Sequence, residues 1–170
     1  FDKKTDEKTV QGYTVTYTDE DVDVGNKGTS TDIDAYSFST YRTINTGKNK
    51  YLEGILGLSK LDFKNTRRDG NNTLNGDRDG NQVFGSLHYI NTFKKDKRDI
   101  SPNFKLDISY TTLDDYSEKG INALQYDKQT VETLGISGGF IVSNEILKKD
   151  FILRPSMALD FGYDLSPSSD

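Results

Sequence analysis

Alternation of apolar and polar residues with a period of two is the sequence feature that most constrains this fold. A β-strand places successive side chains on opposite faces, so such alternation predicts strands with one apolar face. Helical periodicity is nearly absent from the chain. The alternation and the turn-forming residues between its runs predict seven strands, near residues 9–18, 33–44, 51–64, 82–94, 101–113, 128–143 and 151–165.

The alternation, which is cleanest in the segments 9–18, 101–113 and 151–165, predicts which residues of the strands share a face. We expect one face, directed at lipid, to hold Tyr13, Val15, Tyr17, Phe104, Leu106, Ile108, Met157, Leu159 and Phe161. We expect the opposite face, directed at a lumen, to hold Lys105, Asp107, Glu132, Arg154 and Asp160. A register slip of one residue would exchange the two faces, so the assignment is testable in a structure.

The connections between the predicted strands alternate in length. Long, polar segments rich in Gly, Asn and Asp are expected as loops at 19–32, 65–81 and 114–127; short, mostly basic segments are at 45–50, 95–100 and 144–150. Outer-membrane barrels alternate long external loops with short periplasmic turns, and about 9–11 residues span the bilayer. The predicted fold is therefore all-β, an antiparallel meander that forms part of a transmembrane up-and-down β-barrel.

The composition argues against several other classes of protein. A net charge of −5 does not suit a nucleic-acid-binding protein, which needs a basic face. The chain contains no Cys, so neither a thiolate metal site nor a Cys nucleophile is available. No run approaches the roughly 18 apolar residues of a membrane helix. The sequence has no start Met and no signal-peptide pattern, so we expect a processed or excised piece.

Four segments in a fixed order resemble a known family. They are YLEGILGLSKLDFKNTRRD at 51–69, GDRDGNQVFGSL at 76–87, SPNFKLDISYTTLDDYSEKG at 101–120 and ALQYDKQTVETLGISGGF at 123–140. In this order they are similar to autotransporter β-domains, the C-terminal translocator barrels of type V secretion. The resemblance extends over roughly residues 12–165, and the order and spacing of the segments make it more specific than any single motif.

The resemblance implies a twelve-stranded barrel in the bacterial outer membrane, whose lumen is threaded by a helix or linker joined to a secreted passenger. It implies as partners the outer-membrane lipid, the protein's own passenger and linker, and the barrel assembly machinery. It implies no cofactor and no chemical reaction. The chain departs from the family pattern because the passenger, the linker helix and the terminal aromatic strand are missing. We therefore expect residues 1–170 to be a single partial barrel domain that needs flanking strands.

The stretch NGDRDGNQVFGSLHYINTF at 75–93 allows two interpretations of its first half. Asn75, Asp77, Asp79 and Gly80 fit the opening of a calcium-binding loop, in which alternate oxygen ligands precede a glycine. The twelfth position, however, is Ser86 instead of the bidentate Glu, and a strand follows where a helix should. The sequence favours a plain polar loop over a calcium site.

Other candidate chemistry in the sequence is isolated. His88 is the single histidine and has no second ligand beside it, so a structural role is favoured. The glycines of GISGG at 135–139 favour a bend in a curved sheet over a phosphate site. A soluble, surface-exposed β-rich adhesin or binding module is the main alternative function. A glycan-active enzyme is a third possibility, based only on the paired carboxylates Asp114 and Asp115.

Overall fold

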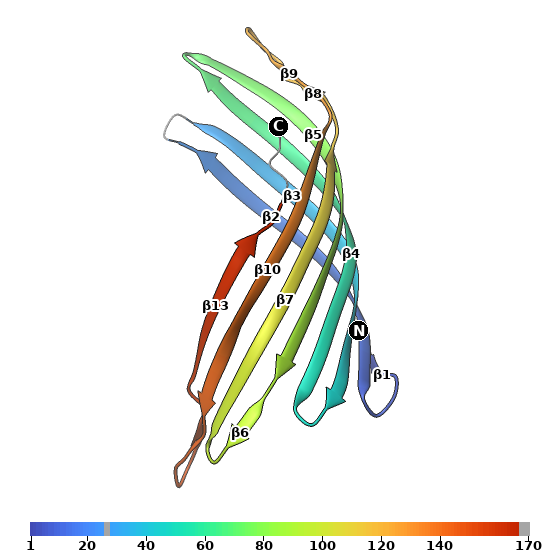
Figure 1. Ribbon diagram of the computed structural model, residues 1–170. Helices are drawn as coiled ribbons and strands as arrows, with labels where there is room; N and C mark the ends of the chain where they lie inside the picture. Colours follow the sequence, from blue (N-terminus) through green and yellow to red (C-terminus); the bar gives the residue numbers. More distant parts are fainter. Residues whose placement is uncertain (26–27, 167–170) are drawn as a thin grey trace.

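The computed structural model describes residues 1–25 and 28–166, which form an antiparallel meander (Figure 1). The main sheet has the order β1-β2-β3-β4-β5-β7-β10-β13, and β6 extends β5 and pairs with β7. Two small sheets, β8–β9 and β11–β12, lie in the connections. The strands are β1 Asp2–Lys4, β2 Thr9–Val24, β3 Thr29–Gly47, β4 Lys50–Asp69, β5 Asn72–Asn91, β6 Phe93–Lys95, β7 Arg98–Leu113, β8 Tyr116–Ser117, β9 Gln125–Tyr126, β10 Gln129–Asn144, β11 Ile146–Leu147, β12 Ile152–Leu153 and β13 Ser156–Asp164.

The predicted all-β antiparallel meander is confirmed, and each of the seven predicted strands corresponds to a long strand of the sheet. These long strands are β2, β3, β4, β5, β7, β10 and β13, and each pairs with its sequence neighbour. The short β1, which was not predicted, pairs with residues 10–12 of β2. Across the described parts of the chain, no helix has the length and apolarity needed to cross a bilayer.

Two of the three predicted long loops are wrong, because the strands continue through them. β2 and β3 remain paired as far as Val24 and Thr29, and β4 and β5 remain paired as far as Asp69 and Asn72. Polar residues sustain most of these hairpins, because a face of the sheet that meets water needs no apolar side chains. At the β4–β5 turn Gly70 has φ 59°, a conformation that glycine adopts without steric penalty.

The calcium-loop and polar-loop interpretations of residues 75–80 are both wrong for the same reason. The whole segment lies in β5, where Asp77 pairs with Lys64 and Asp79 pairs with Asp62. A strand spaces alternate side chains about 7 Å apart along one face, whereas a calcium loop wraps its ligands around the ion. Within residues 1–25 and 28–166, no group of three or more acidic or histidine side chains is arranged to hold a metal.

The two ends of the sheet carry different kinds of connection between strands. The long hairpins β2–β3 and β4–β5 and the irregular segment 114–127 lie at one end, and the short turns lie at the other (Figure 1). β7 pairs with β5 only from Gly80 onward, so β2 to β5 extend past it. We call this extension, residues 18–24, 29–35, 61–69 and 72–80, the upper wall. The eight residues of β5 that precede Gly80 correspond to about 27 Å of strand length.

The sheet is curved but open in the described part of the chain. In this part, β13 pairs with β10 on one side only, and the outer edge of β2 is paired only near its start, with β1 at residues 10–12 and with Phe1 at Tyr13. An unpaired strand edge presents free N–H and C=O groups. The sequence predicted only part of a barrel, and the open sheet in the described residues agrees with that prediction.

Candidate functional site

The register divides the side chains of the sheet into two faces. All nine residues predicted to share an apolar face do lie on one face. Directly paired residues lie on the same face of a sheet, and one such row joins β2 to β7 through Val15, Phe38, Leu58, Val83 and Tyr110. Side chains on this face are exposed, for example Val15 at 81%. Ser39 and Ser59 on the other face are only 6% and 8% exposed. Side chains converge on the inside of a curve, so the apolar face is convex and the other is concave.

The apolar band on the convex face crosses the hydrogen-bonded rows diagonally. The row of Val15 on β2 meets β7 at Tyr110, whereas the row of Leu159 on β13 meets β7 at Pro102, eight residues away. Strands that tilt by 35–45° in a membrane barrel require a stagger of about one to one and a half residues per strand. Six steps from β2 to β13 then require about six to nine residues, which agrees with the displacement of the band.

Tyrosines mark the border of this band on the side of the long hairpins. Tyr17 and Tyr36 are directly paired with ring centroids 5.0 Å apart, and the Tyr17 hydroxyl donates a 2.6 Å hydrogen bond to Asp34 Oδ1. Tyr110 on β7 and Tyr163 on β13 lie at the corresponding border further round the sheet. Tyrosines with an apolar ring and a polar tip favour the interface between hydrocarbon and water.

Glu132 does not lie where the sequence analysis placed it. It pairs directly with Tyr110 and therefore lies on the convex face, not among the concave polar residues. The segment around it contains Gly135, Gly138 and Gly139, which blur the alternation from which a face is inferred. Because the band descends diagonally, Glu132 lies beyond the apolar residues of β10, on the side of the long hairpins.

Arg154 also differs from its predicted place within a strand. It lies between β12 and β13, in the connection at the short-turn end. Its guanidinium forms an ion pair with Glu145, with Nη2–Oε2 and Nε–Oε2 distances of 2.6 and 2.8 Å. Pro155 cannot donate a hydrogen bond to a neighbouring strand, which favours a strand that starts after it, at Ser156.

Charged side chains gather on the concave face of the central strands. Glu53 pairs directly with His88, which pairs directly with Lys105. The His88 Nδ1–Glu53 Oε2 distance is 3.6 Å, and the Lys105 Nζ–Asp107 Oδ1 distance is 2.9 Å. Tyr41 joins Glu53, His88 and Lys105 in lining an open hollow of about 360 Å³. This group, which we call the concave cluster, offers both signs of charge to anything that passes over it.

The remaining predicted concave residue, Asp160, lies further along the same face. It pairs with Gly139, and its Oδ1 accepts a 3.2 Å hydrogen bond from Asn103 Nδ2. Of the five residues predicted for this face, the register places Lys105, Asp107 and Asp160 there. Glu53 was missed by the sequence analysis because the alternation of 51–64 is irregular, so its facing was visible only from its pairing with His88.

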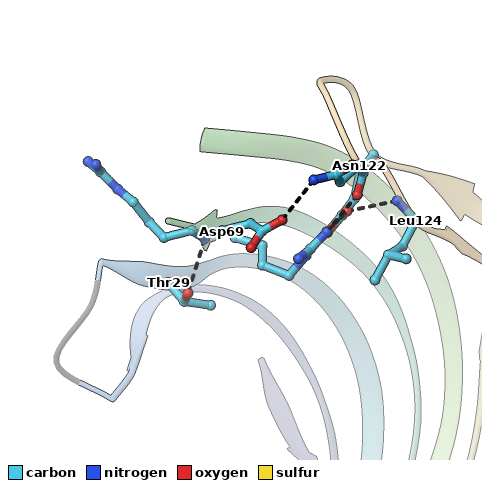
Figure 2. A network of polar contacts seen from close by, with 7 residues as sticks. Thr29, Asp69, Asn122 and Leu124 are labelled. Atoms are coloured by element: carbon cyan, nitrogen blue, oxygen red, sulfur yellow. Dashed lines mark hydrogen bonds and ion pairs between the residues drawn. The ribbon is translucent and has the colours of Figure 1, made fainter. Parts of the chain in front are cut away.

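A network of polar contacts fixes the segment 114–127 to the inner side of the upper wall (Figure 2). Arg67 donates two hydrogen bonds to Glu118, Nε–Oε1 at 2.8 Å and Nη2–Oε2 at 2.7 Å. The Leu124 N–H donates to Glu118 Oε2 at 3.0 Å, and Arg67 Nη2 donates to the Asn122 carbonyl at 3.1 Å. Asn122 Nδ2 in turn donates to Asp69 Oδ2 at 3.3 Å. We call this network the latch.

The latch has an electrostatic and an apolar part. The Glu118 side chain is only 3% exposed, and its hydrogen bonds with Arg67 hold the pKa of the carboxyl below its ordinary value of 4.5 despite burial. The same contact raises the pKa of Arg67. Leu74, which is fully buried, packs beside Gly120, and Tyr116 lies over Gly76, where a β-carbon would overlap its ring.

The carboxylates considered for a glycan-active enzyme are not paired into a site. Asp114 N–H donates to the Asp79 carbonyl at 2.8 Å, and the Asp114 carbonyl accepts a 2.7 Å hydrogen bond from Arg78 Nε. The backbone of Asp114 therefore ties the end of β7 to β5. Both Asp114 and Asp115 are outside the concave cluster, and neither lines one of the described hollows.

Comparison with known proteins agrees with this geometry. A family model described as autotransporter beta-domain matches residues 1–170. The fold is similar to the translocator domain of the autotransporter NalP from Neisseria meningitidis, with a TM-score of 0.82, 18% identity and 96% of this chain covered. It is also similar to the β domain of the Bordetella autotransporter BrkA, with a TM-score of 0.73, 14% identity and 93% covered. The chain spans 57% and 65% of those two structures. No curated protein matches the sequence.

Proposed function

The chain belongs to the autotransporter β-domain family, and on this premise we propose that it forms part of the outer-membrane barrel through which a passenger polypeptide reaches the cell surface. Proteins of this family are outer-membrane proteins of a secretion system, not members of a known enzyme class. In the proposed function the sheet provides a passage and a support, and it performs no chemical reaction on the passenger.

The observation that supports this proposal best is the diagonal apolar band on the convex face. A sheet exposed to water on that face would gain nothing from Val15 at 81% exposure or Met157 at 63% exposure. Lipid would cover these side chains, and the displacement of the band matches the tilt of strands in a bilayer. A soluble adhesin, the alternative from the sequence, would leave this band uncovered and is not favoured.

The concave face would then line the lumen and contact the linker or passenger. The concave cluster presents Glu53, His88, Lys105 and Asp107 from three neighbouring strands. Charged groups of both signs allow a polypeptide of mixed composition to pass without one dominant binding site. Fixed tight binding would oppose transport, so charged side chains around an open hollow of about 360 Å³ suit a passage.

Strands outside residues 1–170 are needed in this proposal to close the barrel. The outer edges of β2 and β13 have free pairing positions in the described residues. In hydrocarbon each unsatisfied backbone group costs several kcal/mol, so an open edge requires a partner strand. Because these edges are exposed until closure, we include the barrel assembly machinery and outer-membrane lipid among the proposed partners.

Single cysteines in the complete protein would test the assignment of the two faces, since the 170 residues contain no native Cys. Ile108→Cys on the convex face should react with a membrane-permeant maleimide and resist a water-soluble one. Ser109→Cys on the concave face should react with the water-soluble reagent through the lumen. Equal reaction of both variants with the water-soluble reagent, or absence of the passenger from the surface of intact cells, would contradict the proposal.

A further inference from the structure

The polarity of the two faces of the sheet reverses above the tyrosine border. On the convex face of the upper wall, Asp19, Asp34, Asp62 and Asp79 form one directly paired row, and no apolar side chain lies on that face among the described residues. On the concave face, Ile33 pairs directly with Phe63, and their neighbours toward the band are Ala35 and Leu61. The apolar side chains therefore lie on the convex face in the band and on the concave face in the upper wall, beyond the tyrosine border.

Apart from Val24 and the buried Leu74, the apolar residues on the concave face of the upper wall form one strip across β2, β3 and β4. The strip consists of Val22, Ile33, Ala35, Leu61 and Phe63. Val22 is 43% exposed, and the other four are half-buried. The segment 114–127 bounds the strip on the β5 side, because Tyr116 lies over Gly76 and the latch holds Glu118 against Arg67. The remainder of the strip faces the space enclosed by the curve of the sheet.

Lipid does not explain this strip. It lies on the face opposite to the lipid-facing band and beyond the Tyr17–Tyr36 border and the row of aspartates. In water, a sheet with one apolar face normally packs that face against another element. The occupant must fit a concave surface about three strands wide, roughly 10–15 Å, which matches a single polypeptide segment and not the flat face of a second protein.

We propose that this strip is a docking surface for an apolar stretch of the transported polypeptide as it leaves the lumen. This inference rests on the proposed function, which sends the polypeptide toward this end of the sheet. The strip lies on the same concave face as the concave cluster, so a segment that passes the cluster meets the strip next. Glu20 and Arg78 occupy the two ends of the Ile33–Phe63 row and supply one charge of each sign beside it.

The docking surface would hold the polypeptide near the membrane until more of it has emerged. Burial of apolar area is non-directional, so the strip can bind different apolar side chains in turn. The strip is small, so each contact is weak and transient, as transport requires. The acidic convex face of the upper wall would stay in water and keep the hairpins soluble.

A photo-crosslinking amino acid in the complete, secreting protein tests the docking surface. The crosslinker is placed at Phe63 and, in a second protein, at Ile33, with matched controls at Asp62 and Asp34. Each control is the sequence neighbour of a test residue, lies on the opposite face, and the two controls pair with each other as the test residues do. We expect adducts with the passenger when the crosslinker is at Phe63 or Ile33, and no such adducts when it is at Asp62 or Asp34.

A third test position keeps the experiment decisive if the inner variants assemble poorly. Val22 lies at the exposed margin of the strip and has room for the larger side chain. Heat-modifiable mobility on gels shows whether each variant has assembled. A passenger that reaches the cell surface without an adduct from Phe63, Ile33 or Val22 overturns the docking surface alone. Adducts only with residues 114–127, with lipid or with a second copy also overturn it. A passenger that never reaches the surface in the unsubstituted protein overturns the proposed function instead.

Discussion

Phe104 shows how the position of a single residue in the apolar band decides its role. It lies on the convex face of β7, near the middle of the diagonal band, and is 52% exposed. Its sequence neighbours Asn103 and Lys105 lie on the concave face with the charged residues. Two adjacent residues of one strand therefore meet hydrocarbon and water in the proposed barrel, and equal substitutions should have unequal effects.

Replacing Phe104 with Arg in the complete barrel should destabilise it by about 2–4 kcal/mol, because the cation would lie near the middle of the bilayer. Asn103→Arg, one residue away on the concave face, should change the free energy of unfolding far less. Urea unfolding of the protein in lipid vesicles measures both values. Equal destabilisation by the two substitutions would contradict the assigned faces.

Among the elements, the segment 114–127 depends on contacts that are distant in the sequence. Glu118 and Arg67 are 51 residues apart, and Leu74 packs against the same segment from β5. This segment has little regular structure of its own beyond the two-residue strands β8 and β9. Its placement on the upper wall is therefore controlled by the latch and by the burial of Leu74.

Acid should release the segment 114–127 from the upper wall. The pKa of Glu118 is lowered in the folded state, so its contribution to stability is complete above its ordinary value of 4.5 and is lost as the pH falls through the lowered pKa. The protection of the Leu124 amide, which donates to Glu118, should fall below pH 4.5 when its exchange is compared with the intrinsic rate at each pH. In Glu118→Gln this protection should be low already at neutral pH and should change little with pH.

Truncation of Leu74 should loosen the same segment without affecting the membrane band. Leu74→Ala removes a fully buried side chain, and such substitutions cost about 2–5 kcal/mol when the surroundings relax little. Faster hydrogen exchange in 114–127, with unchanged exchange in the middle of β7, is the expected result. Leu124→Ala is the control, since that side chain is 49% exposed. Equal effects of the two variants would show that Leu74 is not the anchor.

At the scale of the whole molecule, residues 1–170 form an open sheet with an uncovered apolar face. Its free edges lie on β2 and β13, and the convex band has no second layer in the described residues. Both features favour association with other chains in water. The family match and the 57% span of the NalP translocator domain are consistent with a barrel that further strands complete.

Expressed alone without detergent, residues 1–170 should therefore form oligomers or aggregates and should show no cooperative thermal unfolding as a monomer. Light scattering and circular dichroism during heating measure these properties. The same chain extended by the strands that close the barrel, in detergent, is the positive control. A soluble monomer of residues 1–170 that melts cooperatively would reject the barrel assignment and support the adhesin alternative.

The local sequence was sufficient to predict the strands and, for most of the residues considered, the face of the sheet on which each one lies. Tyr13, Val15 and Tyr17 alternate with threonines, and alternation is a property of one strand that needs no knowledge of its neighbours. The number of long strands, their meander order and the shared face of the nine apolar residues followed from this pattern. The alternation of Gly and Arg with Asn and Asp at 75–80 was also visible, but the turn-forming composition outweighed it.

The tertiary structure alone decided everything that depends on pairing between strands. The register sets which residues of different strands are level with one another, so it placed Glu132 beyond the band and brought Glu53 to His88. The latch between Arg67 and Glu118 joins residues whose local sequences contain no sign of each other. The reversal of polarity in the upper wall likewise requires four strands to be aligned. Periodicity specifies the faces of each strand, whereas the relative position of strands is a property of the whole sheet.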